Sequence, residues 1–201
     1  MADSIRSIAC RLATQFAVLR ARDFERLGVP RHCLKALVED GLWERTGRGL
    51  YRPSQTAPGT HHSLLEVARQ SPQAVVCLLS ALRYHELTTE TPSEVWIAVP
   101  RNAWTPKPSL VRLKVVHLSG ASFTEGIEEH RHEGVTVRVY PIPKTVADCF
   151  KFRNQIGVNV AVEALRDAWR SRKATVDELW HNAKVCRVSN IIRPYLETVV
   201  Q

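Results

Sequence analysis

Apolar residues recur at helical spacing through the first forty residues of the chain. Ile5, Ile8, Ala9, Leu12 and Phe16 would share one face of a helix. The segments that follow are short and end at glycine, a common residue just past the end of a helix. The pattern predicts a helix over 5–16, an extended piece over 17–20, a helix over 21–28 and another helix over 29–41.

The stretch 40–53 alternates apolar and polar residues around closely spaced glycines. This pattern predicts a two-stranded hairpin that turns at 47–49. Trp43, Leu50 and Tyr51 would hold the hairpin to the preceding helices. The positions that would face outward carry Arg45, Arg48 and Arg52.

The pattern changes after the proline-containing stretch 53–60, and we interpret 54–60 as a linker. We expect a helix from 62, a buried strand over 74–79 and a short helix capped by Ser80. Strands should follow over 94–100 and 110–118, with a hairpin over 126–143 that turns near Gly134. From Lys144 onward we expect helices, one capped by Thr175 and one kinked at Pro194. The fold class is therefore α+β. Residues 1–53 would form a winged helix-turn-helix, and 61–201 an α+β domain with a small sheet and a helix-rich C-terminus.

Positive charge is concentrated at the start of the chain. The chain carries 28 Lys and Arg against 20 Asp and Glu, a net charge of +8. Residues 1–53 hold ten of these basic residues and six of the acidic ones. This quarter of the chain therefore carries half of the net positive charge. Such a concentration favours an anionic partner of the N-terminal region.

The order of helices followed by a hairpin is typical of a winged helix-turn-helix, which places its second motif helix in the DNA major groove. Arg31, His32 and Lys35 would face the bases, and the hairpin arginines would contact phosphate or the minor groove. Two further arginines, Arg20 and Arg22 just before the first motif helix, would clamp phosphate. The candidate DNA-binding residues are Arg20, Arg22, Arg31, His32, Lys35, Arg45, Arg48 and Arg52.

The segment "VLRARDFERLGVPRHCLKALVEDGLWERTGRGLYRP" resembles the N-terminal winged-helix domain of AbiEi-type antitoxins, which belong to bacterial abortive-infection toxin–antitoxin pairs. Two later segments, "LLSALRYHELTTETPSEVWIAVPRNAW" and "VRVYPIPKTVADCFKFRNQIGVNVAVEALRDAW", resemble the C-terminal region of many members. The resemblance implies an antitoxin that binds inverted repeats in its own promoter, represses its operon and opposes a nucleotidyltransferase-type toxin. Some members act alone as regulators.

Catalytic patterns are absent from the sequence beyond residue 60. No Asp or Glu has Lys two positions later, as a metal-dependent nuclease of the kind found in some relatives needs, and no Asp-x-Asp pair occurs. The pairs His61–His62 and His130–His132 have no Cys or carboxylate set at ligand spacing, so solvated histidines are the simpler interpretation. We therefore expect no enzyme activity, no metal and no cofactor. The five scattered cysteines are expected in the core.

A non-catalytic C-terminal domain would supply a contact surface. The candidate contacts to a partner protein or to DNA flanking the operator are Arg101, Trp104, Lys107, Lys144 and Lys151. For Lys144, an i,i+4 ion pair with Asp148 is the alternative. A stand-alone regulator and a protein-interaction module remain the alternative functions. No apolar run approaches the roughly 20 residues that span a bilayer, and the N-terminus lacks a signal-peptide pattern, so we expect a cytoplasmic protein without membrane contact.

Overall fold

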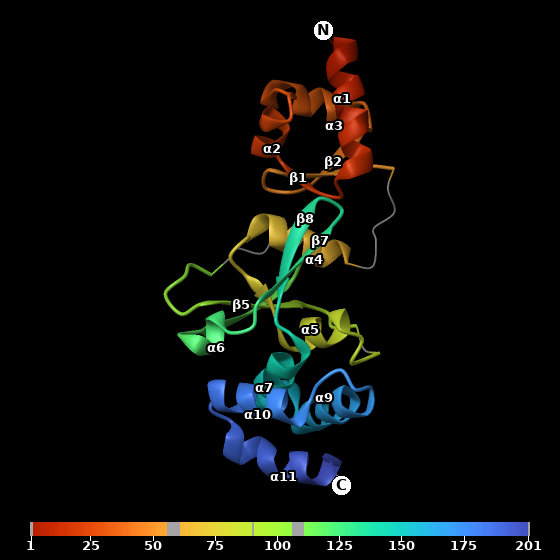
Figure 1. Ribbon diagram of the computed structural model, residues 1–201. Coiled ribbons are helices and arrows are strands. Elements are labelled where there is room, and N and C mark those ends of the chain that lie inside the picture. Colours follow the sequence, from red (N-terminus) through yellow and green to blue (C-terminus); the bar gives the residue numbers. More distant parts are fainter. Residues whose placement is uncertain (1, 56–60, 90, 106–110, 201) are drawn as a thin grey trace. The chain divides into compact units, whose positions relative to one another are not determined.

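The protein forms two compact units in the computed structural model, which describes residues 2–55, 61–89, 91–105 and 111–200 (Figure 1). The N-terminal unit consists of Met1–Gln73, Pro106–Arg112 and His130–Val137, and the C-terminal unit of Ala74–Thr105, Leu113–Glu129 and Arg138–Gln201. Residues 56–60 of the predicted linker lie outside the described residues. The compact N-terminal unit is larger than the predicted domain 1–53, because it also takes in a helix after the linker and part of a later hairpin.

Short elements that alternate with glycine turns build the N-terminal unit. In chain order they are α1 Ala2–Gln15, β1 Leu19–Arg20, α2 Ala21–Arg26, a 3-10 helix Arg31–Cys33, α3 Leu34–Glu39, β2 Trp43–Gly47, β3 Leu50–Pro53 and α4 His62–Gln70. Gly28, in the turn that follows α2, has a φ of +90°, in the left-handed region that suits glycine. The predicted helix over 29–41 is observed as a 3-10 turn that continues into α3.

An aromatic pair lies at the centre of the N-terminal core. The rings of Phe24 and Trp43 meet edge to face with their centroids 4.7 Å apart. The indole N–H of Trp43 donates to the carbonyl of Ala9 at 3.3 Å, so its polar atom is satisfied although the side chain is buried. This pair joins α2, the hairpin and α1 into one core.

The predicted hairpin is confirmed. Strands β2 and β3 pair antiparallel, and β1 adds to the other edge of β3, giving the order β1-β3-β2. The register shifts between Arg45 and Gly47, and Gly49 adopts a φ of +71° in the turn. We call this hairpin, Trp43–Pro53, the wing.

Helix α4 and a turn near Gly134 complete the N-terminal unit. The Arg69 guanidinium of α4 donates to the carbonyls of Val18 at 3.1 Å and Gly134 at 3.3 Å. It also lies 3.5 Å from the Asp23 carboxylate and over the ring of Phe16. One side chain therefore holds three chain segments together.

The C-terminal unit contains most of the larger sheet and a helical layer. Its first elements are β4 Val75–Val76, α5 Leu78–Tyr84, β5 Val95–Pro100, β6 Leu113–Leu118 and α6 Ala121–Thr124. A hairpin of β7 Glu128–His132 and β8 Val135–Val139 follows, and its turn region belongs to the N-terminal unit. The helical layer consists of α7 Ile142–Lys151, α8 Arg153–Ile156, α9 Val158–Arg170, α10 Val176–Val185 and α11 Ser189–Val200. The sheet order is β6-β5-β4-β8-β7. β5 runs parallel to β6 and antiparallel to β4.

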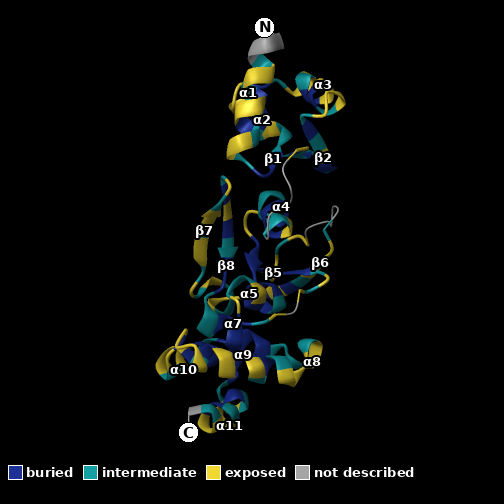
Figure 2. Ribbon diagram, turned by 90° about the vertical axis from the view of Figure 1, so that its right-hand side faces the viewer, coloured by how far each residue is buried: buried dark blue, intermediate teal, exposed yellow. Residues whose placement is uncertain are grey.

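Helix α7 is the centre of the C-terminal core. It packs against α5, α9 and α10, and Figure 2 shows it largely in the colour of buried residues. The predicted hairpin near Gly134 and the predicted cap at Thr175 are both confirmed, the cap by a hydroxyl that accepts the Glu178 N–H. Together with the N-terminal unit, this sheet and helical layer confirm the α+β class.

Three local predictions are wrong. The buried strand expected over 74–79 is limited to Val75–Val76, because α5 already begins at Leu78. Ser80 lies inside α5 rather than at its start, and its hydroxyl accepts the Trp96 N–H at 2.9 Å. Cys10 is exposed, whereas Cys77, Cys149 and Cys186 are in the core as expected. Burial raises the pKa of those three thiols, which makes them poor nucleophiles.

Candidate nucleic-acid interface

The first part of the interface is the exposed face of the 3-10 turn and α3. Leu34 and Leu37 are buried, which fixes the rotation of the helix and leaves Arg31, His32 and Lys35 exposed. These three predicted residues therefore share one solvent-facing surface.

Two of these cations are paired with surface acids. Arg31 Nε lies 3.0 Å from the Glu25 carboxylate of α2, and Lys35 lies 3.7 Å from Glu39 one turn later. All four side chains are at least 46% exposed, so each ion pair can open at small energetic cost.

The wing presents its three arginines in three different states. Arg48 lies exposed in the turn itself. Arg45 is exposed and donates through Nε to the Gly47 carbonyl at 3.1 Å, which orients its side chain toward the turn. Arg52 is paired across the strands with Glu44, its register partner in the hairpin. Arg45 and Arg48 therefore carry most of the available positive charge of the wing.

A cluster of three arginines around one acid forms the third part of the candidate interface. Arg20, Arg22 and Arg69 line a small pocket of about 170 Å³ together with Asp23. The Asp23 carboxylate accepts the Arg20 backbone N–H at 3.0 Å and lies 3.5 Å from the Arg69 guanidinium. One acid against three cations leaves a local excess of positive charge.

Burial and mutual repulsion act on this cluster. Burial lowers the pKa of Arg20, and nearby Arg22 lowers it further, whereas Asp23 opposes the shift. Burial also lowers the pKa of Arg69. Arginine stays charged at neutral pH despite such shifts. Arg69 was missed by the sequence interpretation because it follows Asp23 by 46 positions, and nothing local in α4 marks it as a partner of α2.

The predicted contacts of the C-terminal unit are only partly on a surface. Arg101 is exposed and Trp104 is 81% exposed, whereas Lys107 lies outside the described residues. Lys151 is partly buried, and its ammonium donates to the Ser122 hydroxyl at 3.3 Å.

The predicted surface role of Lys144 is wrong. Its side chain is fully buried and pairs with Asp148 at 2.5 Å, and its ammonium lies 4.1 Å from the centroid of the Tyr140 ring. The alternative, the intrahelical ion pair, is the observed arrangement. A buried ammonium cannot contact a partner while the unit is folded.

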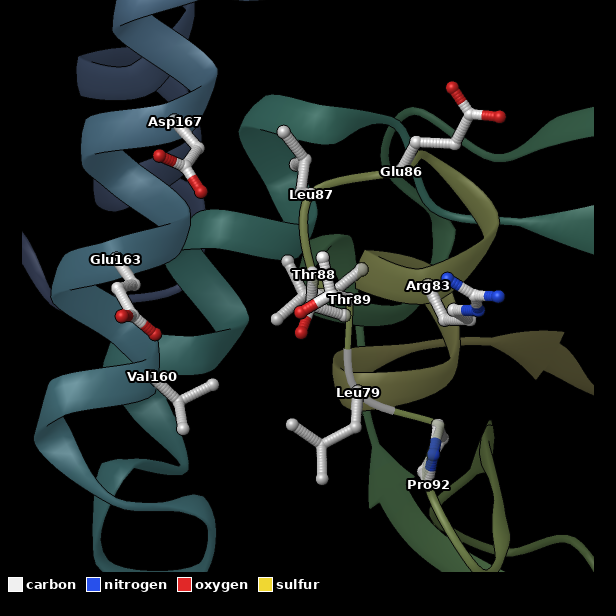
Figure 3. A pocket seen from close by; sticks show the side chains of 11 residues that line it. Leu79, Arg83, Glu86, Leu87, Thr88, Thr89, Pro92, Val160, Glu163 and Asp167 are labelled. Carbon is white, nitrogen blue, oxygen red and sulfur yellow. The ribbon is translucent and has the colours of Figure 1, made fainter.

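A cleft of about 550 Å³ opens in the C-terminal unit between α9 and the segment that follows α5 (Figure 3). In Figure 3, Glu163 and Asp167 lie on α9 and Thr88 and Thr89 lie on the segment across from it, while the Arg83 side chain points away from α9. The cleft is lined by carboxylates, threonines and aliphatic residues. Among the described residues that line the cleft there is no Ser, Cys, His or Lys.

Histidines gather elsewhere in the N-terminal unit without forming a recognisable metal site. The ring of His132 lies 5.3 Å from that of His61 and 6.5 Å from that of His130, measured between centroids. Across the described ranges, no group of three His, Cys, Asp or Glu is placed to hold a metal ion. None of the helices that the structure describes is both long and apolar enough to cross a bilayer.

Residues 11–54 match the model of a protein family described as "Transcriptional regulator, AbiEi antitoxin". The match begins within α1 and covers α2, the 3-10 turn, α3 and the wing. A crystal structure of the RV2827C protein from Mycobacterium tuberculosis is similar over 96% of this chain and 80% of that chain, with 11% sequence identity and a TM-score of 0.49. No curated protein matches the sequence. The N-terminal region thus has the sequence pattern of AbiEi antitoxin regulators, as the resemblance predicted.

Proposed function

We propose that the protein is a DNA-binding antitoxin that represses its own operon. The N-terminal unit would bind inverted repeats in the promoter as double-stranded DNA. The C-terminal unit would oppose a nucleotidyltransferase-type toxin without catalysis. The observation that carries the proposal is the arrangement of cations on the 3-10 turn and α3, on the wing, and around Asp23. All of these cations except Arg69 lie within the segment that matches the regulator family.

Each cation set has its own task in this proposal. The side chains of Arg31, His32 and Lys35 stand on a helix face that is free to enter a major groove, where arginine reads guanine by a bidentate hydrogen bond. Arg45 and Arg48 extend from a hairpin and would contact phosphates on either side of the groove. Arg20 and Arg22 would bind a further phosphate beside α2.

The first test measures DNA binding by the full chain. If four to six phosphates are neutralised, the logarithm of the binding constant should fall with the logarithm of salt concentration with a slope of roughly −4 to −5. Arg48→Ala should weaken binding to the promoter and to random DNA by similar factors. Arg31→Ala should cost about 1–3 kcal/mol on the promoter and less on random DNA.

Arg166→Ala is the matched control, because it removes the same charge from an exposed position of α9 in the other unit. It should leave both affinities unchanged. Binding that does not depend on salt would contradict the proposed interface. Equal losses for Arg31→Ala on both DNAs would assign Arg31 to phosphate rather than to bases.

A second test separates repression from toxin neutralisation. The full chain and its Arg31→Ala/Arg48→Ala variant would be co-expressed with a nucleotidyltransferase-type toxin from an unrelated promoter. Both should rescue growth, because the antitoxin surface is proposed to lie in the C-terminal unit. Failure of both to rescue would favour a stand-alone regulator.

A further inference from the structure

A second cavity of the C-terminal unit, of about 470 Å³, has a strongly one-sided charge. Three side chains that can carry positive charge line it: His117 of β6, Lys151 at the end of α7 and Arg187 just after α10. No Asp or Glu is among the described residues that line it. Because the three side chains come from separate elements, folding rather than a local charge run brings them together.

Lys151 keeps its positive charge unpaired by any carboxylate among the described residues. Its ammonium donates to the Ser122 hydroxyl, which in turn donates to the Val185 carbonyl at 3.0 Å. An ammonium has three donors, so two remain for a ligand. The acid that precedes it on α7, Asp148, is buried and already accepts from Lys144 and the Cys186 thiol.

The rest of the lining fits an organic group beside an anion. Ser119 adds a hydroxyl donor, and Leu118 and Phe152 add apolar surface. A phosphate has several acceptor oxygens, and it is bound well by a guanidinium fork and an ammonium together. The volume lies within the roughly 300–1,000 Å³ of small-molecule sites, which is more than a bare phosphate fills.

We propose that this cavity binds a small phosphomonoester, with its phosphate held by Lys151 and Arg187 and its organic group against Phe152. The site is separate from the DNA-binding surface proposed above and does not depend on it. The sequence led us to expect that Lys151 contacts a macromolecular partner. In this proposal Lys151 binds a small ligand instead.

The test titrates the full chain with adenosine monophosphate by isothermal calorimetry. We expect saturable binding with a Kd of about 1 mM or tighter, which is within reach of one charge-assisted contact network. Inorganic phosphate should compete with the nucleotide, and adenosine should bind at least about tenfold more weakly because it lacks the phosphate. Lys151→Gln and Arg187→Gln should each weaken nucleotide binding about tenfold or more, and Arg166→Gln should not.

Thermal unfolding of each variant would verify that the C-terminal unit remains folded. Equal affinity for adenosine and its monophosphate would overturn the phosphate assignment. Unchanged nucleotide binding in both cavity variants would overturn the location. An absence of binding by both phosphate and nucleotide, with a loss of duplex DNA binding in Lys151→Gln, would replace the small-ligand site by a DNA contact.

Discussion

Two ion pairs with the same sequence spacing lie in opposite environments, one exposed and one buried. Lys35 and Glu39 form an i,i+4 pair with side chains that are 86% and 64% exposed, whereas Lys144 and Asp148 form an i,i+4 pair with 0% and 1% exposed. Burial raises the pKa of Asp148, and the Lys144 ammonium and the Cys186 thiol oppose that shift. The sequence spacing is the same in both pairs, so only the surroundings decide the energetics.

Lys144→Met should therefore destabilise the C-terminal unit by about 3–5 kcal/mol, because it leaves a buried carboxylate without its partner. The double variant Lys144→Met/Asp148→Leu should recover most of the loss. The control Lys35→Met should change stability by less than about 1 kcal/mol. Urea unfolding at neutral pH would measure all three.

The same variant makes a pH prediction with a definite sign. Without Lys144, the folded-state pKa of Asp148 would rise further above its ordinary value of 3.8. A raised pKa makes the folded state relatively more stable below the ordinary value, and that advantage is lost as pH rises through the folded-state value. The loss in free energy of unfolding caused by Lys144→Met should thus be smaller in acid than at neutral pH. A deficit that is constant from neutral pH down to the acid limit of folding would argue against a charged Asp148.

At the scale of elements, helix α10 shows how much a local signal can determine. The Thr175 hydroxyl accepts the Glu178 N–H at 3.2 Å, and the Glu178 carboxylate accepts the Thr175 N–H at 2.8 Å. This reciprocal pair satisfies two donors at the start of the helix. The backbone hydrogen bond from Thr175, followed by that from its side chain, lowers the pKa of Glu178.

Thr175→Ala should lower stability by about 1 kcal/mol, which for a chain of this size is a Tm decrease of about 2–4 °C. Because the folded-state pKa of Glu178 is lowered, its contribution is present above the ordinary value of 4.5 and is lost as pH falls through the folded-state value. The difference in Tm between the unsubstituted chain and Thr175→Ala should therefore narrow as pH falls below 4.5. Thr198→Ala in α11 removes the same atoms away from a helix start, so an equal effect there would contradict the capping explanation.

The elements predicted well from the sequence are those whose signals are local. Glycine turns, the Thr175 cap and the alternation in the wing each depend on residues a few positions apart. The short strand β4 was overestimated because a run of six apolar residues fits a strand and a buried helix start equally well. Ser80 was misassigned because its hydroxyl bonds Trp96, which lies far along the chain.

The candidate site was predictable to the same extent. The helical period correctly placed Arg31, His32 and Lys35 on the exposed side of the 3-10 turn and α3, because the apolar neighbours Leu34 and Leu37 fix the buried side. Arg69 and the pairing of Arg52 with Glu44 depend on how separate segments meet. Lys144 looked like a surface residue, and only the packing around α7 shows that it is buried. The roles of these residues in DNA binding stay predictions.

The whole chain crosses between its two compact units several times. The N-terminal unit takes residues from before 74, from 106–112 and from 130–137. Gly134, at the turn of the last of these pieces, lies so close to Phe16 of the first that an added Cβ would be 2.3 Å from the ring. Its φ of +73° also disfavours any side chain.

Gly134→Ala should therefore destabilise the N-terminal unit more than Gly49→Ala does. Both positions have a positive φ of similar size, but a Cβ at Gly49 would meet no atom within 4 Å. The backbone conformation alone should cost about 1–3 kcal/mol in each, and the contact with Phe16 adds to this only at Gly134. Urea unfolding would compare them, and in a Phe16→Ala background the two glycine substitutions should cost about the same. Equal losses in the two single variants would mean that the contact relaxes freely.

The hydrogen bonds and ion pair of Arg69 restrict which N-terminal segments of this chain can be transferred to a related protein. A hybrid that carries residues 1–55 onto a foreign C-terminal region would bring Val18 and Asp23 but leave behind the guanidinium that bonds both. It would also leave behind the glycine that makes room for Phe16. A single recombination point in the linker therefore cannot transfer the N-terminal unit intact. If the N-terminal unit binds an operator as proposed, new preferences should be reached more readily by point substitutions at exposed positions such as 31, 32 and 35 than by shuffling of N-terminal segments.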